Sequence, residues 1–255
     1  MTSAQCPAGR WVSRPAPKTD PRVRLFCFHH AGGASDLFSS WTKELDPSIE
    51  VALIQLPGRG SRFREPAITS MDAVIQQLAG ALTPLLEHPF AFFGHSMGGL
   101  IAFELARLLE RRQINLGHLF LSGCPAPQAR TNRRVSTMND QQLVAFLSAM
   151  NGTPPDVLEH PELRDLIVPL VRADFHLVET YSFKPGARLR APVSLLLGSN
   201  DPETGPADVG LWSELTEAPC NMRQFDGDHF FVKANPGAVT AWISATLLRL
   251  PAVAP

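Results

Sequence analysis

The amino-acid sequence predicts an α/β fold in which a mostly parallel central sheet carries helices on both faces. Short apolar segments with strand character alternate with amphipathic helical segments, and this alternation is typical of a parallel sheet. One strand is joined to the next helix by a G-x-S-x-G turn, and over about 124–186 the strand signal disappears and only helical patterns follow. The expected strands lie near 23–28, 50–56, 90–94, 117–122, 192–198 and 220–225, and the expected helices near 35–45, 71–87, 97–112, 208–217 and 236–250.

The chain of 255 residues divides into a leader and one domain. Residues 1–20 are polar and contain prolines but no apolar signal-peptide core, so we expect a loose leader. Residues 21–255 are expected to form a single α/β domain, because α/β folds of this length are often undivided. Helical patterns within about 124–186 predict a helical lid insertion above the carboxyl ends of the strands. Pro84 is expected to kink the helix near 71–87.

Composition argues against several classes of function. The formal net charge of −1 gives no electrostatic reason to bind nucleic acid, and no apolar run approaches the roughly 20 residues that span a bilayer. We expect a cytoplasmic monomer with no metal, no cofactor and no membrane partner. The four cysteines are scattered without the paired spacing of a metal site: Cys6, Cys27, Cys124 and Cys220.

The G-x-S-x-G turn presents Ser96 as a candidate nucleophile. An apolar strand over 90–93 precedes it, and an amphipathic helix over 100–110 follows it. A strand that turns sharply into a helix forces the serine into a strained conformation, and glycine at positions 94 and 98 avoids a clash there. The turn therefore predicts a serine hydroxyl exposed at the sheet edge, next to the amide of Met97 at the start of the helix.

A serine nucleophile needs a base and a group that orients the base. In hydrolases with this turn, the chain order is Ser, then Asp or Glu, then His. Asp201 follows the apolar strand near 192–198, and His229 lies in the loop after the strand near 220–225, so both fall in the required order. We interpret His229 as the base and Asp201 as the acid that orients it. The competing residues are interpreted as packing, turn, cap or surface groups: His29, His30, His88, His95, His118, His160, His176, Asp174, Asp226 and Asp228.

The second oxyanion donor is expected from a glycine-rich loop after an early strand. The loop over 29–33 follows the strand near 23–28, and we choose the Ala31 amide there, with the Met97 amide as the first donor. A plain turn at these glycines is the alternative, and it is compatible with a donor site. The expected lid would cover an apolar acyl chamber, for which we select Phe146, Met150 and Phe175. The wider set of apolar lid residues comprises Leu143, Phe146, Leu147, Met150, Leu166, Leu170, Phe175 and Leu177.

These motifs together resemble the type II thioesterases associated with polyketide synthases and nonribosomal peptide synthetases. The resemblance implies an α/β-hydrolase fold with a helical lid, and a triad of Ser96, Asp201 and His229. It also implies hydrolysis of stalled or aberrant acyl thioesters from the phosphopantetheine arm of carrier proteins, by way of an acyl-serine. At His29 the family pattern more often has proline. The matching segments are Phe28-His29-His30-Ala31-Gly32-Gly33, Gln55-Leu56-Pro57-Gly58-Arg59-Gly60, Gly94-His95-Ser96-Met97-Gly98-Gly99, Arg172-Ala173-Asp174-Phe175 and Gly227-Asp228-His229-Phe230-Phe231.

Two other functions use the same residues. A carboxylesterase or lipase-like hydrolase would carry the same triad, and a non-catalytic binding protein of hydrolase fold would be expected to lose triad members. Under the thioesterase interpretation the partners are carrier-protein domains, which are commonly acidic. Two basic clusters are therefore candidates for docking, with ordinary solvated surface as the alternative: Arg59, Arg62 and Arg64, and Arg130, Arg133 and Arg134.

Overall fold

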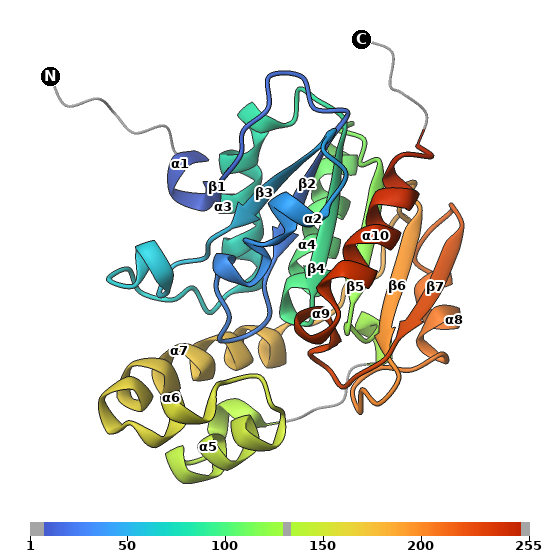
Figure 1. Ribbon diagram of the computed structural model, residues 1–255. Helices are drawn as coiled ribbons and strands as arrows, with labels where there is room; N and C mark the ends of the chain where they lie inside the picture. Colours follow the sequence, from blue (N-terminus) through green and yellow to red (C-terminus); the bar gives the residue numbers. More distant parts are fainter. Residues whose placement is uncertain (1–7, 130–133, 251–255) are drawn as a thin grey trace, which may run out of the picture.

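In the computed structural model, which describes residues 8–129 and 134–250, a twisted sheet lies between two helical layers (Figure 1). Within these residues seven strands pair in the order β1-β3-β2-β4-β5-β6-β7. β1 is antiparallel to β3 and every other pair is parallel. The predicted mostly parallel sheet is thus confirmed. The strands are β1 (Val12–Ser13), β2 (Val23–Phe28), β3 (Ile49–Ile54), β4 (Phe90–His95), β5 (His118–Ser122), β6 (Val193–Gly198) and β7 (Cys220–Phe225).

Helices cover both faces of the sheet, as predicted. Neighbouring side chains on a strand point to opposite faces. Phe92 accordingly packs with α3 and α4, whereas Phe93 packs against Phe38 and Trp41 on the other face. The five strands from β2 to β6 are buried along their whole length, which explains their nearly continuous apolar sequences. One layer contains α3 (Met71–Leu82), α4 (Met97–Arg111) and α8 (Asp208–Ser213), and the other contains η1 (Ser35–Phe38), α2 (Trp41–Glu44), α9 (Phe231–Ala234) and α10 (Pro236–Leu247).

Two expected helices differ from the structure. The helix expected near 35–45 is divided into η1 and α2, each of four residues. The helix expected near 71–87 ends at Leu82, and Pro84 lies in a separate 3-10 turn, η3 (Thr83–Leu85). Pro84 therefore ends the α-helix instead of kinking it, since proline lacks an amide and its ring obstructs the preceding turn.

Part of the expected loose leader is docked on the domain. α1 (Ala8–Trp11) leads into β1, which pairs with β3. Trp11 is 7% exposed, and the Arg62 guanidinium lies 4.1 Å from the centre of its ring. Burial of this indole and the cation–π contact explain why the segment departs from the expectation for a leader. Residues 1–7 of the expected leader lie outside the described residues.

The helical insertion lies at the carboxyl ends of the strands, where Figure 1 shows it below the sheet. It has an apolar core of its own, in which Leu143 and Val168 are buried. Leu166, expected on an apolar face, is instead 70% exposed. No helix in the described part of the chain is long and apolar enough to cross a membrane. The lid consists of η4 (Pro127–Ala129), η5 (Val135–Thr137), α5 (Asp140–Ala149), α6 (Pro155–Glu159) and α7 (Pro161–Thr180).

We predict that His118 makes folding sensitive to acid. His118 is buried at the start of β5, where Nε2 lies 2.8 Å from the Ser194 hydroxyl oxygen on β6. Burial lowers the pKa of His118 from 6.5 to about 4. Between these two values the unfolded chain takes up a proton that the folded chain does not, so stability falls as the pH falls.

The measurement is urea unfolding of the wild type and of His118→Gln from pH 7.5 to pH 4.5. This histidine should contribute up to about 1.4 kcal/mol per pH unit below pH 6.5. The variant should therefore have a shallower dependence of unfolding free energy on pH. Parallel curves for the two proteins would contradict the prediction.

Candidate active site

Ser96 lies at the sharp turn between β4 and α4. Its backbone has φ 54° and ψ −118°, a conformation that a residue with a side chain rarely adopts. The turn is fixed on both sides, because the Ser96 amide donates to the Ser122 carbonyl at 2.8 Å and the Gly99 amide donates to the Ser96 carbonyl at 2.9 Å. The strain predicted from the G-x-S-x-G spacing is present.

The glycines of the turn are required by close backbone contacts. A Cβ at Gly94 would lie 2.3 Å from the Gly98 carbonyl oxygen, and a Cβ at Gly98 would lie 2.2 Å from the Phe28 carbonyl oxygen. Both separations are far below any real contact of a side-chain carbon. The start of α4 thus rests directly on the end of β2.

Asp201 and His229 are brought together by loops that follow β6 and β7. Nδ1 of His229 lies 2.9 Å from Oδ2 and 3.0 Å from Oδ1 of Asp201. A carboxylate only accepts, so Nδ1 carries the proton and Nε2 is left as a proton acceptor. The carboxylate also accepts from the Glu203 amide and the Thr204 hydroxyl, both at 2.8 Å.

Opposing effects act on the Asp201 carboxyl. Burial favours its neutral form and by itself would raise the pKa. Hydrogen bonds from His229, Glu203 and Thr204, together with the charge of His229, outweigh burial and lower the pKa below its usual value. Asp201 therefore stays ionised and can stabilise a protonated His229.

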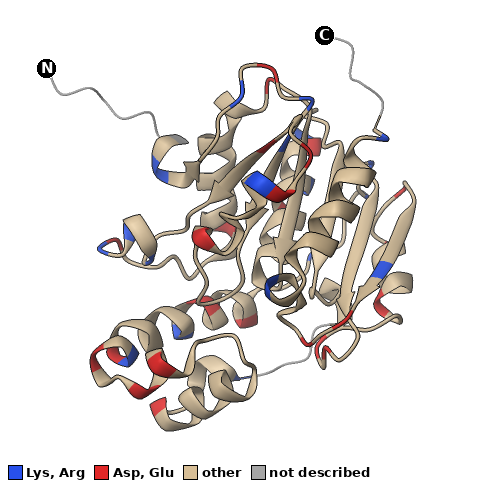
Figure 2. Ribbon diagram, viewed as in Figure 1, with Lys and Arg blue, Asp and Glu red and all other residues tan. Residues whose placement is uncertain are grey.

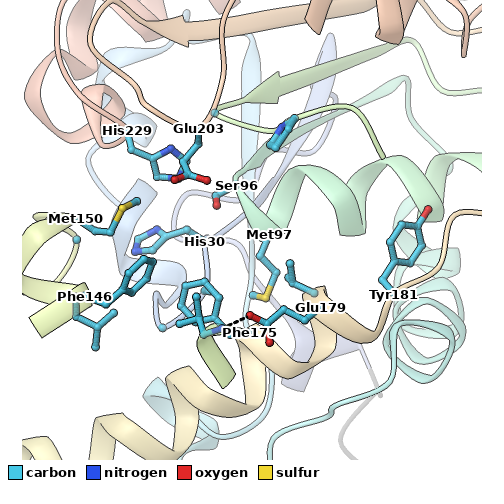
Figure 3. Close-up of a pocket in the computed structure, with 18 of the residues that line it drawn as sticks. His30, Ser96, Met97, Phe146, Met150, Phe175, Glu179, Tyr181, Glu203 and His229 are labelled. Atoms are coloured by element: carbon cyan, nitrogen blue, oxygen red, sulfur yellow. Dashed lines mark hydrogen bonds between the residues drawn. The ribbon is translucent and has the colours of Figure 1, made fainter. Parts of the chain in front are cut away.

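Ser96 and His229 line one cavity of about 360 Å³, covered by the lid (Figure 3). Phe146 and Met150 of the α5 region and Phe175 of α7 line the same cavity. The three residues selected from the sequence for the acyl chamber thus lie beside the candidate nucleophile. The cavity joins an apolar lid to the polar end of the sheet.

The two amides chosen as oxyanion donors also belong to this cavity, since Ala31 and Met97 are among its lining residues. Within residues 8–129 and 134–250, neither amide donates a hydrogen bond to another protein group. The next amide along, that of Gly32, donates to Asp174. Two residues whose amides have no protein partner thus line the cavity that contains Ser96.

Buried neutral histidines surround the candidate base. The ring of His95, interpreted as a packing group, lies 5.1 Å from that of His229, and its Nδ1 lies 3.0 Å from the Ser122 hydroxyl. Burial, followed by the charge of His229, lowers the pKa of His95 well below 6.5. Burial, followed by the charge of His29, also lowers the pKa of His30 well below 6.5. His95 and His30 are therefore uncharged packing partners.

Several cavity residues were not selected from the sequence. Glu203 lies only two residues after Asp201, and Glu179 lies one helical turn after Phe175. Their spacing from selected site residues could therefore have placed both at the cavity. Tyr181 follows α7 directly, and its hydroxyl donates to Glu104 at 2.6 Å. Leu147, from the wider set of apolar lid residues, also lines the cavity. The further lining residues are His30, Gly32, Gly123, Pro125, Pro127, Val135, Gly152, Thr153, Val178, Ser182, Phe183 and Phe230.

One predicted docking cluster is wrong. Arg59 is buried and paired with Asp174, and Arg62 is buried and paired with Glu65. Buried guanidinium groups whose charges are already paired cannot form a docking patch, which leaves only Arg64 of that cluster exposed. In the second cluster Arg134 is exposed, whereas Arg130 and Arg133 lie outside the described residues.

Ser96, His229 and Asp201 form a combination of groups that defines one class of enzyme. Serine hydrolases of the α/β-hydrolase fold combine a strained serine at a strand-to-helix turn with an imidazole and a carboxylate from later loops. This chain has the fold of that class, and its site has the same three parts. Among the described residues, no group of three or more His, Cys, Asp or Glu side chains is arranged to hold a metal ion.

Comparison with known proteins identifies the family. The model of the thioesterase domain matches residues 23–247. Thioesterase PikA5 of Streptomyces venezuelae is 36% identical over 88% of this chain and 81% of its own length. Linear gramicidin dehydrogenase LgrE of Brevibacillus parabrevis is 36% identical over 97% of this chain and 96% of its own.

A solved structure agrees with this result. The type II thioesterase BorB from the borrelidin biosynthetic cluster superimposes with a TM-score of 0.85 and 36% identity, over 93% of this chain and 97% of its own. The chain therefore belongs to the thioesterase family. The resemblance to type II thioesterases and the α/β-hydrolase fold inferred from the motifs are both confirmed.

We predict opposite effects for two glycine-to-alanine substitutions in helices. Gly98→Ala places a Cβ against the Phe28 carbonyl and should lower the unfolding free energy by about 3 kcal/mol or more, with loss of activity. Gly80→Ala, at an exposed position of α3 with nothing within 4 Å, should raise it by about 0.5–1 kcal/mol. Chemical denaturation of both variants measures the contrast, and similar changes in both would contradict it.

Proposed function

We propose that this protein hydrolyses acyl thioesters on the phosphopantetheine arm of carrier proteins, and so removes stalled or aberrant acyl groups from a polyketide synthase or nonribosomal peptide synthetase. The observation that carries the proposal is the placement of Ser96 and the His229–Asp201 pair in one lidded cavity. Membership of the thioesterase family supports the type of bond cleaved. The printed origin of BorB, the borrelidin biosynthetic cluster, supports the setting.

In the first step Ser96 is acylated. Oγ attacks the thioester carbonyl carbon while its proton passes to Nε2 of His229, and Asp201 stabilises the imidazolium. The carbonyl oxygen becomes an oxyanion that accepts from the amides of Ala31 and Met97. Collapse breaks the carbon–sulfur bond, and the thiolate leaves with the proton from His229. Each oxyanion donor is expected to contribute a factor of about 100 or more to the rate.

In the second step water replaces the thiol. His229, neutral again, removes a proton from a water molecule as the water oxygen attacks the acyl carbon of the ester on Ser96. The second oxyanion uses the same two amides. Its collapse breaks the bond to Oγ, which regains a proton from His229, and the free carboxylic acid leaves. The enzyme returns to its starting state without a net change in protons on the triad.

The partner of this reaction is a carrier domain that brings its acyl group covalently attached. The reaction needs no cofactor bound by this chain, and one chain contains every residue that the two steps use, so the proposed active form is a monomer. Cys27 and Cys220 are free thiols, which suits the reducing cytoplasm where such synthases work.

A carboxylesterase with the same triad is the second candidate. The triad does not distinguish a thioester from an oxygen ester, so the choice rests on family membership. The name of LgrE denotes a redox enzyme, but the serine turn, the His–Asp pair and the two free amides are parts of acyl transfer. A binding protein without activity is disfavoured because all three triad positions are occupied and two of them are hydrogen-bonded.

We predict that Ser96→Ala abolishes deacylation. Intact-mass measurement of an acyl-loaded carrier protein should show loss of the acyl group with the wild type. The variant should be slower by at least about 10⁴-fold. Persistence of the acyl group with the wild type, combined with cleavage of a simple oxygen ester, would replace the proposed function by an esterase.

We predict that Phe146 limits the length of the acyl chain. Its ring lies 5.6 Å from the ring of Phe175 in the cavity, so Phe146→Trp should fill space that a long chain requires. We expect kcat/KM for an octanoyl thioester to fall at least about tenfold, with little change for an acetyl thioester. Phe63→Trp, at a residue that is 60% exposed, is the control. Equal changes for both chain lengths would contradict the prediction.

A further inference from the structure

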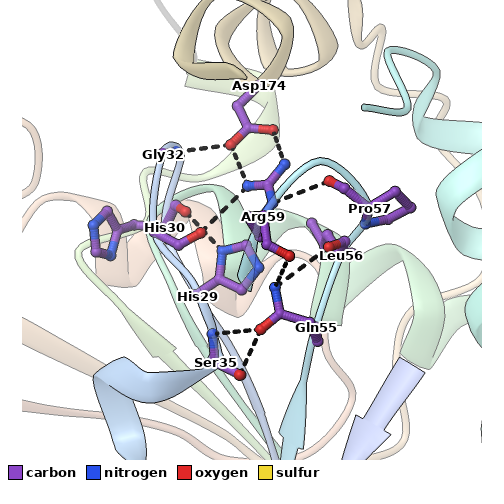
Figure 4. A network of polar contacts seen from close by, with 10 residues as sticks. His29, His30, Gly32, Ser35, Gln55, Leu56, Pro57, Arg59 and Asp174 are labelled. Carbon is purple, nitrogen blue, oxygen red and sulfur yellow. Dashed lines mark hydrogen bonds and ion pairs between the residues drawn. The ribbon is translucent and has the colours of Figure 1, made fainter. Parts of the chain in front are cut away.

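A buried ion pair joins the lid to the edge of the sheet. Arg59 follows β3 and Asp174 belongs to α7, and their side chains are 4% and 2% exposed. The pair is bidentate, with Nη1 to Oδ2 at 2.5 Å and Nη2 to Oδ1 at 2.8 Å (Figure 4). Such a pair fixes the orientation of both groups, because the planar fork of arginine matches the carboxylate.

The same two side chains hold the loop after β2. Oδ2 of Asp174 accepts from the Gly32 amide at 2.7 Å, and Nη1 of Arg59 donates to the Gly33 carbonyl at 3.4 Å. Arg59 is held in turn, since its Nε donates to the Pro57 carbonyl at 3.2 Å. The lid helix, the segment after β3 and the loop after β2 therefore meet in one polar cluster.

The peptide bond between His30 and Ala31, which carries the Ala31 amide, lies just before the Gly32 amide that donates to Asp174. Its carbonyl oxygen, that of His30, accepts from Nδ1 of His29 at 2.9 Å and from the Gly33 amide at 3.0 Å. Burial, together with the charge of Arg59, lowers the pKa of His29 to about 3, so the ring is neutral. The N–H and C=O of a trans peptide point in opposite directions. The Ala31 amide is therefore directed away from these partners, and Ala31 lines the cavity.

Packing of α7 on the loop reinforces this arrangement. Gly32 has φ +73°, and a Cβ there would lie 2.7 Å from Cγ2 of Val171. Gly58 has φ +86°, and its Cβ would lie 3.1 Å from Cδ1 of Leu170. One face of α7 thus rests on both loops, with the carboxylate of Asp174 between them.

We propose that Asp174 and Arg59 are positioning residues that set the Ala31 amide for the oxyanion. This inference rests on the proposed function, in which that amide stabilises the tetrahedral state. Neither side chain lines the acyl cavity. Loss of the pair should therefore reduce kcat by about 10- to 100-fold through misplacement of the donor, while KM for a small thioester changes by less than about twofold.

The test compares Asp174→Asn with Glu50→Gln. Glu50 forms the matched control, because its buried carboxylate pairs with Arg24 at 2.5 Å between β3 and β2, away from the cavity. Each variant removes the charge of one buried, ion-paired carboxylate, and both should lower the melting temperature. At a temperature where both remain folded by circular dichroism, only Asp174→Asn should lose kcat on an N-acetylcysteamine thioester.

A second readout separates positioning from general loosening. In a trifluoromethyl ketone analogue of the acyl chain, the carbonyl carbon is attacked by Oγ of Ser96. The ketone oxygen then becomes an oxyanion in the cavity. Its affinity should fall by the same factor as kcat in Asp174→Asn and stay unchanged in Glu50→Gln. Full kcat and full inhibitor affinity in Asp174→Asn would overturn the proposal.

Folding and substrate identity are controlled separately. If Asp174→Asn does not fold, the double variant Arg59→Met with Asp174→Leu removes both charges and leaves the Gly32 amide without its acceptor, so it should show the same loss. If the wild type cleaves only oxygen esters, the proposed thioesterase function fails. The comparison is then made on a p-nitrophenyl ester, where retention of kcat in the variant would still overturn the positioning role.

Discussion

The rest of the site depends on a contact between backbones at the serine turn. No side chain separates the start of α4 from β4 or from the end of β2, because Gly94 and Gly98 lack a Cβ at the two closest approaches. The Met97 amide and the loop after Phe28 therefore lie close together at the carboxyl edge of the sheet. The strained conformation of Ser96 persists because the pairing of β4 and the first turn of α4 both fix it.

Burial of neutral imidazole groups sets the electrostatics around this contact. His29, His30 and His95 each leave one ring nitrogen buried without a partner among the described residues, and burial lowers the pKa of each. A positive charge on any of these rings would oppose protonation of His229. With these rings neutral, Asp201 is the hydrogen-bonded counter-charge to the His229 imidazolium that the proposed acyl transfer requires.

The sequence predicts the sheet because each strand is a local pattern of residues. It predicts the candidate triad because Ser96, Asp201 and His229 occur in the chain order of this class of hydrolase. The buried strands are nearly continuous apolar runs, and Asp201 lies just after one of them, β6. His229 lies in the loop after β7, a strand that is mostly polar and exposed. Contacts between distant segments leave no such signal. Asp174 resembles a turn or cap residue in the sequence but pairs with Arg59, 115 positions away, and this pairing also removes Arg59 from the expected docking surface. Trp11 likewise contacts Arg62, and the strand that follows it pairs with β3. The polar residues around Trp11 in the sequence do not indicate either contact.

Charge on the lid constrains how an acidic carrier can reach the cavity. Acidic residues recur along the lid helices, where Figure 2 marks them in red, and several of them are exposed. Like charges repel over about 10 Å at moderate salt. Arg59 and Arg62, which would offset this charge, are paired inside the protein. Under the proposed function, Arg59 and Arg62 therefore take no part in docking an acidic carrier, and the exposed arginines of the two clusters within residues 8–129 and 134–250 are Arg64 and Arg134. The exposed acidic residues of the lid are Asp140, Asp156, Glu159, Glu162 and Asp165.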